Sequence, residues 1–265
     1  MKRKARRYLG LAFFALAGLG VVWGVTQPMP YVIISPGPAY NVISELEGSV
    51  LIIVSGVPLA DNPGTLDMLT VSIGGTPQSQ PGALDVVGAY LSSDQSVEPM
   101  EEFYPYDENL DEVIRADRKD FTDSIDSAIY VAKKHLAPKI SQAMKVDVNL
   151  EDVGGPSAGM MLTLGIIDKA SPESLTGGKY IAGTGTIDKH GNVGAIGGIR
   201  FKLISAQRAG DKFFLAPKEN CSEVVGNIPR GLKVFAVGNI DDALKILKVI
   251  ASDGNLGKLP VCTDQ

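Results

Sequence analysis

A single uncharged segment near the N-terminus divides this chain into two parts of different character. The first seven residues, MKRKARR, include five basic residues, and YLGLAFFALAGLGVVWGV (8–25) follows without a charge. Eighteen apolar residues are about enough to cross the hydrocarbon core of a bilayer as one helix. Basic residues at one flank indicate the cytoplasmic side. The sequence therefore predicts one transmembrane helix, a cytoplasmic N-terminus and an exported body.

The alternative for this segment is a cleaved signal peptide. Ala15-Leu16-Ala17 resembles a small-residue cleavage site. The apolar run, however, continues to Val25, and Trp23 lies near its far end, where interfacial aromatic residues are enriched. We favour an uncleaved signal anchor, with the protein at the cell membrane.

Composition excludes several classes of function for the part after the anchor. The formal net charge is −5, and no basic face is evident beyond the N-terminus, so we expect no nucleic-acid partner. Cys221 and Cys262, with His135 and His190, form no metal-ligand spacing, so we expect no metal. Both histidines are expected on the surface. An exported pair of cysteines leaves two outcomes open, a disulfide between them or free thiols.

Hydrophobic patterning predicts an α/β or α+β domain with a mixed sheet. Four parts are expected: residues 1–26 as basic tip and anchor, 27–119 as a β-rich extension with an acidic loop that packs on the next domain, 120–250 as the main domain, and 251–265 as a tail. Helical periodicity or start signals indicate helices at 121–136, 157–169, 199–209 and 240–250. Extended segments are expected at 29–43, 50–60, 66–75, 145–153, 212–217 and 232–237, the first of them broken at residues 36–38 by Pro, Gly and Pro. Residues 95–120 are expected to form surface loop and a short helix.

The segment DVGGPSAGMM (152–161) carries one serine, Ser157, at a predicted helix start. Serine is a favoured N-cap, but the same position places the hydroxyl beside free N–H dipoles, as an oxyanion hole requires. A nucleophilic serine needs a base, and the histidines are poorly placed. Lys202, in the apolar start of the helix at 199–209, would serve if burial lowered its pKa. The alternative is that Lys202 lies on the solvent-exposed face of that helix and has no catalytic role.

Several motifs in order resemble the proteolytic domain of Lon-type Ser–Lys proteases. They are GPSAG (155–159), TGTIDKHGNVGAIGGIRFK (184–202) and APKENC (216–221), within about residues 120–250. The resemblance implies the Lon proteolytic-domain fold, Ser157 as nucleophile, Lys202 as general base and Thr184 as the residue that orients the lysine. It also implies a homo-oligomeric ring.

The flanks resemble the membrane-anchored Lon-like proteases of Gram-positive bacteria, which usually carry a PDZ domain. Here only APKISQAMK (137–145), nine residues, stands where that domain would be inserted, so a PDZ domain is not expected. A second departure is Gly154, because classical Lon enzymes often have an acidic residue three positions before the serine. The role of that acid is not carried over.

The sequence thus predicts an ATP-independent serine endopeptidase at the membrane, acting on protein or peptide substrates without a cofactor. The backbone at Gly155, Pro156 and Ala158 is the expected oxyanion site. No GxxxxGK[ST] phosphate loop occurs in the chain. The competing interpretation is a catalytically silent, protease-like binding or assembly module at the membrane surface.

Overall fold

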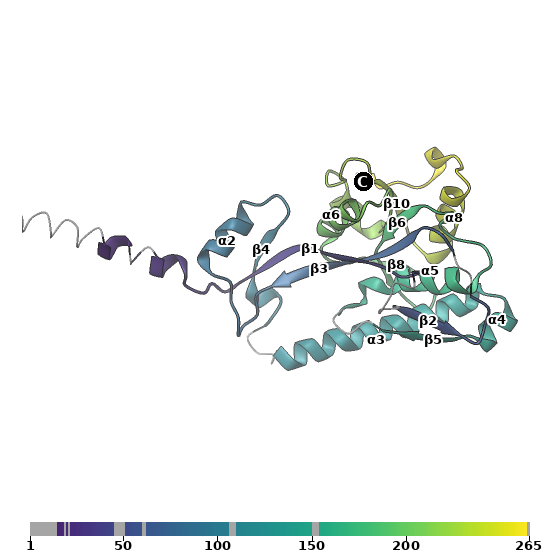
Figure 1. Cartoon of the computed structure of the whole chain (residues 1–265), viewed down its shortest axis with the longest axis horizontal. Helices are drawn as coiled ribbons and strands as arrows, with labels where there is room; N and C mark the ends of the chain where they lie inside the picture. The colour runs from purple at the N-terminus through teal and green to yellow at the C-terminus, as the bar shows by residue number, and fades with distance from the viewer. Residues whose placement is uncertain are drawn as a thin grey trace, which may run out of the picture. The chain divides into compact units, whose positions relative to one another are not determined.

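The computed structural model describes residues 15–18, 20, 22–44, 51–59, 62–105, 110–149 and 154–263. They divide into two compact units (Figure 1). Unit 1 contains the described residues of 1–35 and 72–110, and unit 2 those of 36–71 and 111–265. The sequence assigned residues 36–71 to an extension at 27–119. In the structure they belong instead to unit 2, together with Ser157, Thr184 and Lys202.

A mixed sheet of six strands forms the framework, in the order β10-β9-β6-β3-β1-β4. Strands β3 and β6 pair in parallel, as do β6 with β9 and β9 with β10, whereas β1 and β4 are antiparallel. The bounds are β1 Tyr31–Asn41, β3 Thr65–Gly74, β4 Ser96–Pro99, β6 Tyr180–Gly183, β9 Phe213–Pro217 and β10 Lys233–Val237. The expected mixed α/β architecture is confirmed. Strand β1 continues through Pro36 and Pro38, where the sequence predicted a break.

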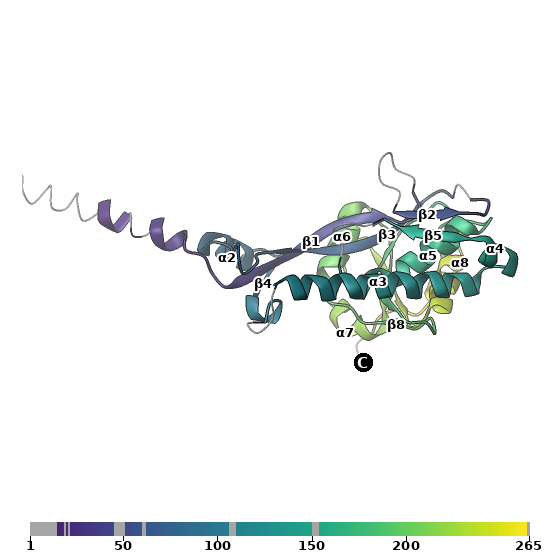
Figure 2. The same ribbon diagram turned by 90° about the horizontal axis from the view of Figure 1, so that it is seen from below.

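Alternating side chains of the sheet in unit 2 enter two separate cores, as the period of two along a strand requires. One core contains Leu66, Ile181, Leu215 and Phe235, together with apolar residues of α3 (Leu110–His135), α5 (Gly159–Ala170) and α8 (Ile240–Ala251). The other contains Leu69, Ala182, Phe214 and Val234, together with α6 (Ile199–Ala209) and α7 (Cys221–Val224). Helices α5 and α6 therefore cover opposite faces (Figure 2).

Two small antiparallel pairs complete the strands that the structure describes. Strand β2 (Ile52–Ser55) pairs with β5 (Lys145–Val148), and β7 (Thr186–Ile187) pairs with β8 (Val193–Gly194). The helices predicted at 157–169, 199–209 and 240–250 are confirmed as α5, α6 and α8. Short elements are α4 (Pro138–Ala143), η1 (Met100–Glu102), η2 (Pro156–Ala158), η3 (Lys218–Asn220) and η4 (Leu256–Lys258).

The prediction for residues 95–120 is wrong in two respects. Residues 96–99 form β4, and α3 begins at Leu110 and runs for 26 residues, 11 residues earlier than the expected 121. The first turns of α3 present no continuous apolar stripe, so periodicity did not reveal them. Acidic residues in the first turn, Asp111 and Glu112, favour a helix start, and a Lys119–Asp123 ion pair of 2.6 Å supports the exposed face.

Unit 1 contains a helix that the sequence did not predict, α2 (Ala83–Tyr90), beside the first residues of β1. Of the apolar segment 8–25, residues 15–18, 20 and 22–25 are described and helical, and the rest lies outside the described residues, as do residues 1–7. Among the residues that the structure describes, no helix has both the length and the apolar character needed to cross a membrane.

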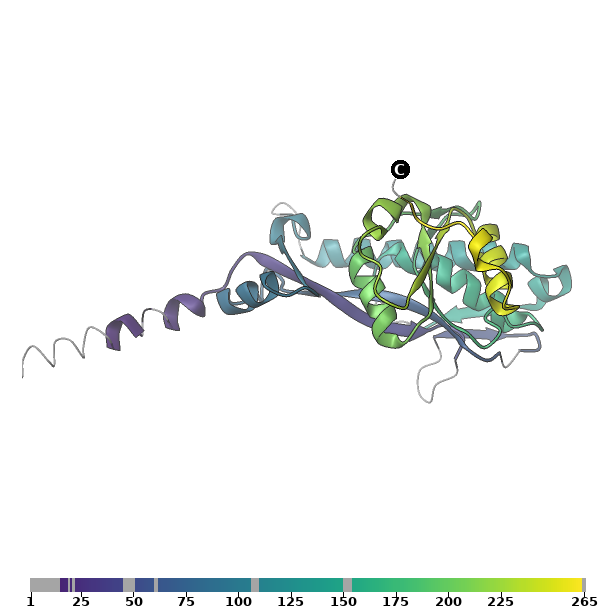
Figure 3. The ribbon, with the colours of Figure 1, turned by 90° about the horizontal axis from the view of Figure 1, so that it is seen from above.

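The C-terminal tail, in which the sequence showed little pattern, is tied to unit 2. The Ala236 N–H of β10 donates to the carbonyl oxygen of Pro260 at 2.9 Å. Cys221 and Cys262 form a disulfide, which closes a separation of 41 residues. Figure 3 shows the tail returning past the end of α8 toward α7.

Candidate active site

Ser157 lies in the tight turn η2 that leads into the buried helix α5. Gly155, before the turn, has φ of +76°, a conformation that a residue with a side chain adopts only under strain. The Ser124 hydroxyl of α3 donates to the carbonyl oxygen of Pro156 at 3.1 Å and so fixes the turn from the other side. Ser157 is not an N-cap, since neither η2 nor α5 has a side-chain cap hydrogen bond. Its hydroxyl is free for another role.

Lys202 projects from the first turn of α6 and is 2% exposed. Gly198 is the residue that precedes the helix, and its φ of +69° places it in the left-handed region. A Cβ there would lie 2.9 Å from Val71 Cγ1, which is too close for a side chain. Burial among apolar residues disfavours the charged amine, and the pKa of Lys202 falls from 10.5 to about 8. Lys202 therefore does not lie on the solvent-exposed face of α6, and that alternative is wrong.

Thr184 directly follows β6, at the carboxyl end of the parallel strands. Its hydroxyl donates to the Ser157 carbonyl oxygen at 3.1 Å. The Lys202 amine donates to Thr184 Oγ1 at 3.0 Å and lies 2.7 Å from Ser157 Oγ. Crevices at this edge of parallel strands are the usual ligand sites in α/β sheets. The turn before α5, the end of β6 and the first turn of α6 thus bring Ser157, Thr184 and Lys202 together.

The Ser157 and Thr184 hydroxyls and the Lys202 amine are joined by hydrogen bonds whose donors and acceptors can be assigned. The Thr184 proton is committed to the Ser157 carbonyl oxygen, so Thr184 accepts one N–H from the lysine. The Lys202 amine also donates to Ser157 Oγ at 2.7 Å, and in its neutral form the same amine can instead accept the Ser157 proton through its lone pair. The arrangement can transfer a proton from serine to lysine.

The backbone donors around Ser157 differ from the expected set. The Gly155 N–H donates to the carbonyl oxygen of Asp117 at 3.3 Å, and Pro156 has no N–H. Neither can serve as the predicted oxyanion donor in this conformation. Ser157 and Ala158 also carry N–H groups in this turn, at the start of a helix, where the first backbone donors have no helical acceptor.

Asp117 of α3 lies against the two glycines before the serine turn, and the sequence did not point to it. A Cβ at Gly154 would overlap the Asp117 carboxylate. Burial, with a smaller contribution from the Asp120 charge, raises the pKa of Asp117 above its usual value. Gly154, the departure from the Lon motif, therefore leaves room for an acidic side chain supplied by another element.

Asn220 is a second residue whose role the sequence motifs did not reveal. Its side-chain carbonyl accepts from the Ile196 N–H and its amide donates to the Ile196 carbonyl oxygen, each at 2.9 Å. The neighbouring Glu219 accepts from the Ala195 N–H at 3.0 Å. These bonds hold the loop that enters α6, and hence the position of Lys202. The motif APKENC contained this signal, but only the fold shows its partner.

The remaining candidates lie apart from this cluster. The His135 ring contacts the Val131 carbonyl oxygen and Asp241 Oδ1, at 2.9 and 3.1 Å, and His190 is exposed in the turn between β7 and β8. Among the described residues, no group of three or more His, Cys, Asp or Glu side chains could hold a metal ion.

The part of the chain that contains Ser157, Thr184 and Lys202 is similar to known proteins. Residues 133–250 match the Lon protease (S16) C-terminal proteolytic domain. Lon protease from Azospirillum brasilense is 38% identical over 94 residues, which is 34% of this chain and 11% of that protein. Lon protease from Buchnera aphidicola (subsp. Schizaphis graminum) and Lon protease 2 from Herpetosiphon aurantiacus are each 39% identical over 95 residues, 35% of this chain and 12% or 11% of theirs. The chain thus spans only about a ninth of the length of these relatives. Over residues 133–250, this chain is therefore similar to the proteolytic domain of Lon proteases (S16), which supports a serine-type peptidase.

Proposed function

We propose that this protein is an ATP-independent serine endopeptidase in which Ser157 is the nucleophile and Lys202 the general base. The observation that carries the proposal is the 2.7 Å contact between Lys202 Nζ and Ser157 Oγ, made by a lysine that is 2% exposed. A serine is a weak nucleophile until a base takes its proton. A lysine with a pKa of about 8 is partly neutral near neutral pH and can do so.

The contacts support the following first half of the reaction. Neutral Lys202 takes the Ser157 proton while Oγ forms a bond to the scissile carbonyl carbon. The oxyanion faces the Ser157 and Ala158 N–H groups, which support its charge. Collapse breaks the C–N bond, and the proton on Lys202 passes to the leaving amine.

The second half regenerates the enzyme. Lys202, neutral again, takes a proton from a water molecule, and the hydroxide adds to the acyl carbon. The Ser157 oxygen leaves and recovers a proton from the lysine. Thr184 holds the amine throughout, because its own proton is bound to the Ser157 carbonyl oxygen.

We place this activity at the outer face of the cell membrane, anchored by residues 8–25. The support is the uncharged 18-residue run with five basic residues before it. The Cys221–Cys262 disulfide supports an oxidising compartment. Exported or membrane-associated proteins are the substrates we propose, and a homo-oligomeric ring is the assembly we expect from the resemblance.

Full-length protein in detergent, incubated with casein in the absence of ATP, tests the proposal. Wild type should produce fragments, Ser157→Ala and Lys202→Ala should not, and the exposed-lysine control Lys248→Ala should match wild type. Equal cleavage by all four proteins would contradict the dyad. Folded wild type without activity on casein and on a peptide library would favour the silent binding module.

A further inference from the structure

Helix α2 carries an apolar stripe with no partner among the residues that the structure describes. Leu84, Val87 and Leu91 are 61%, 54% and 77% exposed and recur at steps of three and four, on one side of the helix. Tyr90, next to them, is 80% exposed. Val86 and Ala89, on the opposite side, are buried against unit 1. A helix with one apolar side in solvent marks a surface for an apolar partner.

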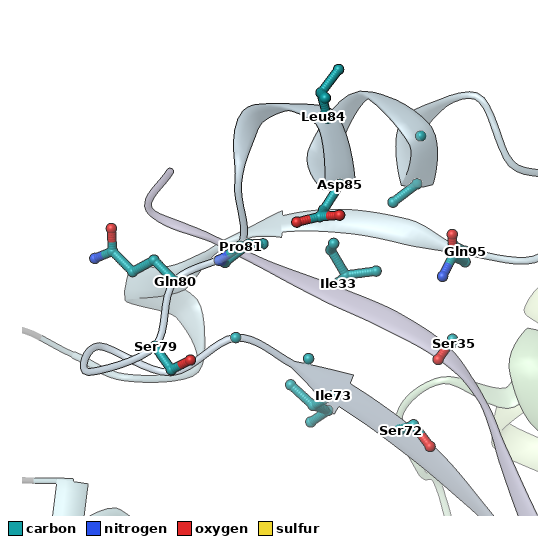
Figure 4. Close-up of a pocket in the computed structure, with 14 residues that line it drawn as sticks. Ile33, Ser35, Ser72, Ile73, Ser79, Gln80, Pro81, Leu84, Asp85 and Gln95 are labelled. Carbon is teal, nitrogen blue, oxygen red and sulfur yellow. The ribbon is translucent and has the colours of Figure 1, made fainter. Parts of the chain in front are cut away.

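No charged side chain interrupts this stripe. The acid of the helix, Asp85, accepts a hydrogen bond from the Gly82 N–H at 3.1 Å. Leu84, Asp85, Ile33 and Ile73 are among the residues that line a pocket beside α2. Figure 4 shows the Asp85 side chain directed toward the strands and the end of the Leu84 side chain directed away from Ile33 and Ile73. The stripe therefore faces outward as an uncharged apolar surface.

The start of α2 is tied to the end of the apolar N-terminal segment. The Met29 N–H donates to the Pro81 carbonyl oxygen at 2.9 Å, and the Ala83 N–H donates to the Gln27 carbonyl oxygen at 3.2 Å. The chain ahead of them is helical over 22–25, and the Gln27 side chain donates back to the Trp23 carbonyl oxygen at 3.0 Å. Only a few residues thus separate the apolar segment from contacts that fix α2.

We propose that α2 lies in the interface of the lipid bilayer, with Leu84, Val87, Tyr90 and Leu91 inserted at the boundary between headgroups and acyl chains. This inference rests on the proposed anchoring by residues 8–25. If that segment crosses the membrane, its hydrogen bonds through residues 27–29 hold α2 at the surface where the segment emerges. Tyrosine favours this zone, since it combines an apolar ring with a hydroxyl that stays wet. Interfacial helices bury an apolar side in this way.

Tryptophan fluorescence of the full-length chain in phosphatidylcholine vesicles tests the inference, with acyl chains brominated near the headgroup as quencher. The chain has one tryptophan, Trp23, so wild type reports on the anchor itself. Tyr90→Trp in a Trp23→Phe background reports on α2. Tyr180→Trp in the same background is the matched control, because Tyr180 is also a solvent-accessible tyrosine, 54% exposed, in unit 2.

We expect brominated lipid to quench wild type and the Tyr90→Trp protein to a similar fraction, and to leave the Tyr180→Trp protein unchanged. Adding Leu84→Ser and Leu91→Ser to the Tyr90→Trp protein should remove its quenching without unfolding, because both side chains are exposed. An unquenched wild type would contradict the anchor. A quenched wild type with an unquenched Tyr90→Trp protein would overturn the α2 proposal alone, and concentration-dependent cross-linking through α2 would then assign the stripe to a second copy of the chain.

Discussion

Lys202 owes its candidate role to its burial rather than to its residue type. At 2% exposure it loses hydration that would stabilise the ammonium ion, and its pKa falls to about 8. Lys248, on α8, keeps its amine in water and offers no comparable chemistry. The same side chain therefore differs in function according to the packing around α6.

The pH dependence of peptide hydrolysis should reveal the lowered pKa of Lys202. The amine acts as a base only when neutral, so kcat/KM should rise tenfold per pH unit below about 8 and level off above it. Lys202→Arg should abolish activity at every pH, because guanidinium stays charged. A rate that does not vary between about pH 6 and about pH 9 would exclude Lys202 as the titrating base.

Thr184→Val tests whether Thr184 orients the Lys202 amine without contributing to substrate binding. Valine keeps the volume but leaves the lysine amine without the acceptor it has at 3.0 Å. Leaving a buried donor without its acceptor costs about 1–3 kcal/mol, so kcat should fall about five- to a hundredfold with little change in KM. Thr184→Ser, which retains the hydroxyl, should recover most of the activity. A Thr184→Val enzyme with an unchanged kcat would show that the threonine has only a packing role.

At the scale of elements, α5 is positioned by close backbone contact. All 12 of its residues are buried, and Gly165 lies where a Cβ would be 2.7 Å from Val42 Cγ2 and 2.9 Å from Ile52 Cδ1. The helix that follows Ser157 thus approaches β2 more closely than a side chain would permit. Glycine weakens a helix interior intrinsically, and here this cost allows the close packing.

Gly165→Ala should therefore destabilise the protein although alanine is the better helix former. We expect a loss of about 1–3 kcal/mol in the free energy of unfolding from overpacking, measured by urea denaturation with circular dichroism. Gly88→Ala in α2 is the comparison, because open space surrounds that position. It should stabilise by about 0.5–1 kcal/mol. A neutral Gly165→Ala would mean that β2 and α5 separate at low cost.

At the scale of the whole molecule, one buried acid pair links stability to pH. Asp67 of β3 and Asp211, between α6 and β9, are 6% and 3% exposed. Burial raises the pKa of Asp211 to about 8, with the Asp67 charge as a further cause, and burial raises the pKa of Asp67 to about 6. Near neutral pH the pair therefore retains a proton.

The sign of the stability change follows from this proton. The unfolded chain releases it near the ordinary value of 3.8, whereas the folded state holds it to about pH 8, so the free energy of unfolding falls as pH rises from about 4 to about 8. Asp211→Asn, which is neutral at all pH values, should flatten most of this slope in urea titrations at about pH 5 and about pH 8. The exposed control Asp126→Asn should retain it. An unchanged slope in Asp211→Asn would assign the pH dependence to other groups.

Short-range pattern was enough to predict the helices α5, α6 and α8 and the strands β9 and β10, because apolar periodicity and glycine punctuation are local properties. The motifs also singled out Ser157, Thr184 and Lys202 as a group, which the structure brings within hydrogen-bond distance. Helix α2, the early start of α3 and the fixed position of Pro36 within β1 had no comparable local signal. Their conformations depend on pairing with distant segments.

The sequence by itself determined which side chains can carry chemistry. The residues next to Ser157 predict a tight turn, and the residues next to Lys202 predict an apolar helix start. Only the tertiary structure decided their environment. The burial that lowers the Lys202 pKa, the Asn220 contacts to Ile196 24 residues away, and the Asp117 carboxylate above Gly154 all join segments far apart in the chain. Desolvation and hydrogen-bond geometry arise from packing in three dimensions, which no single stretch of sequence contains.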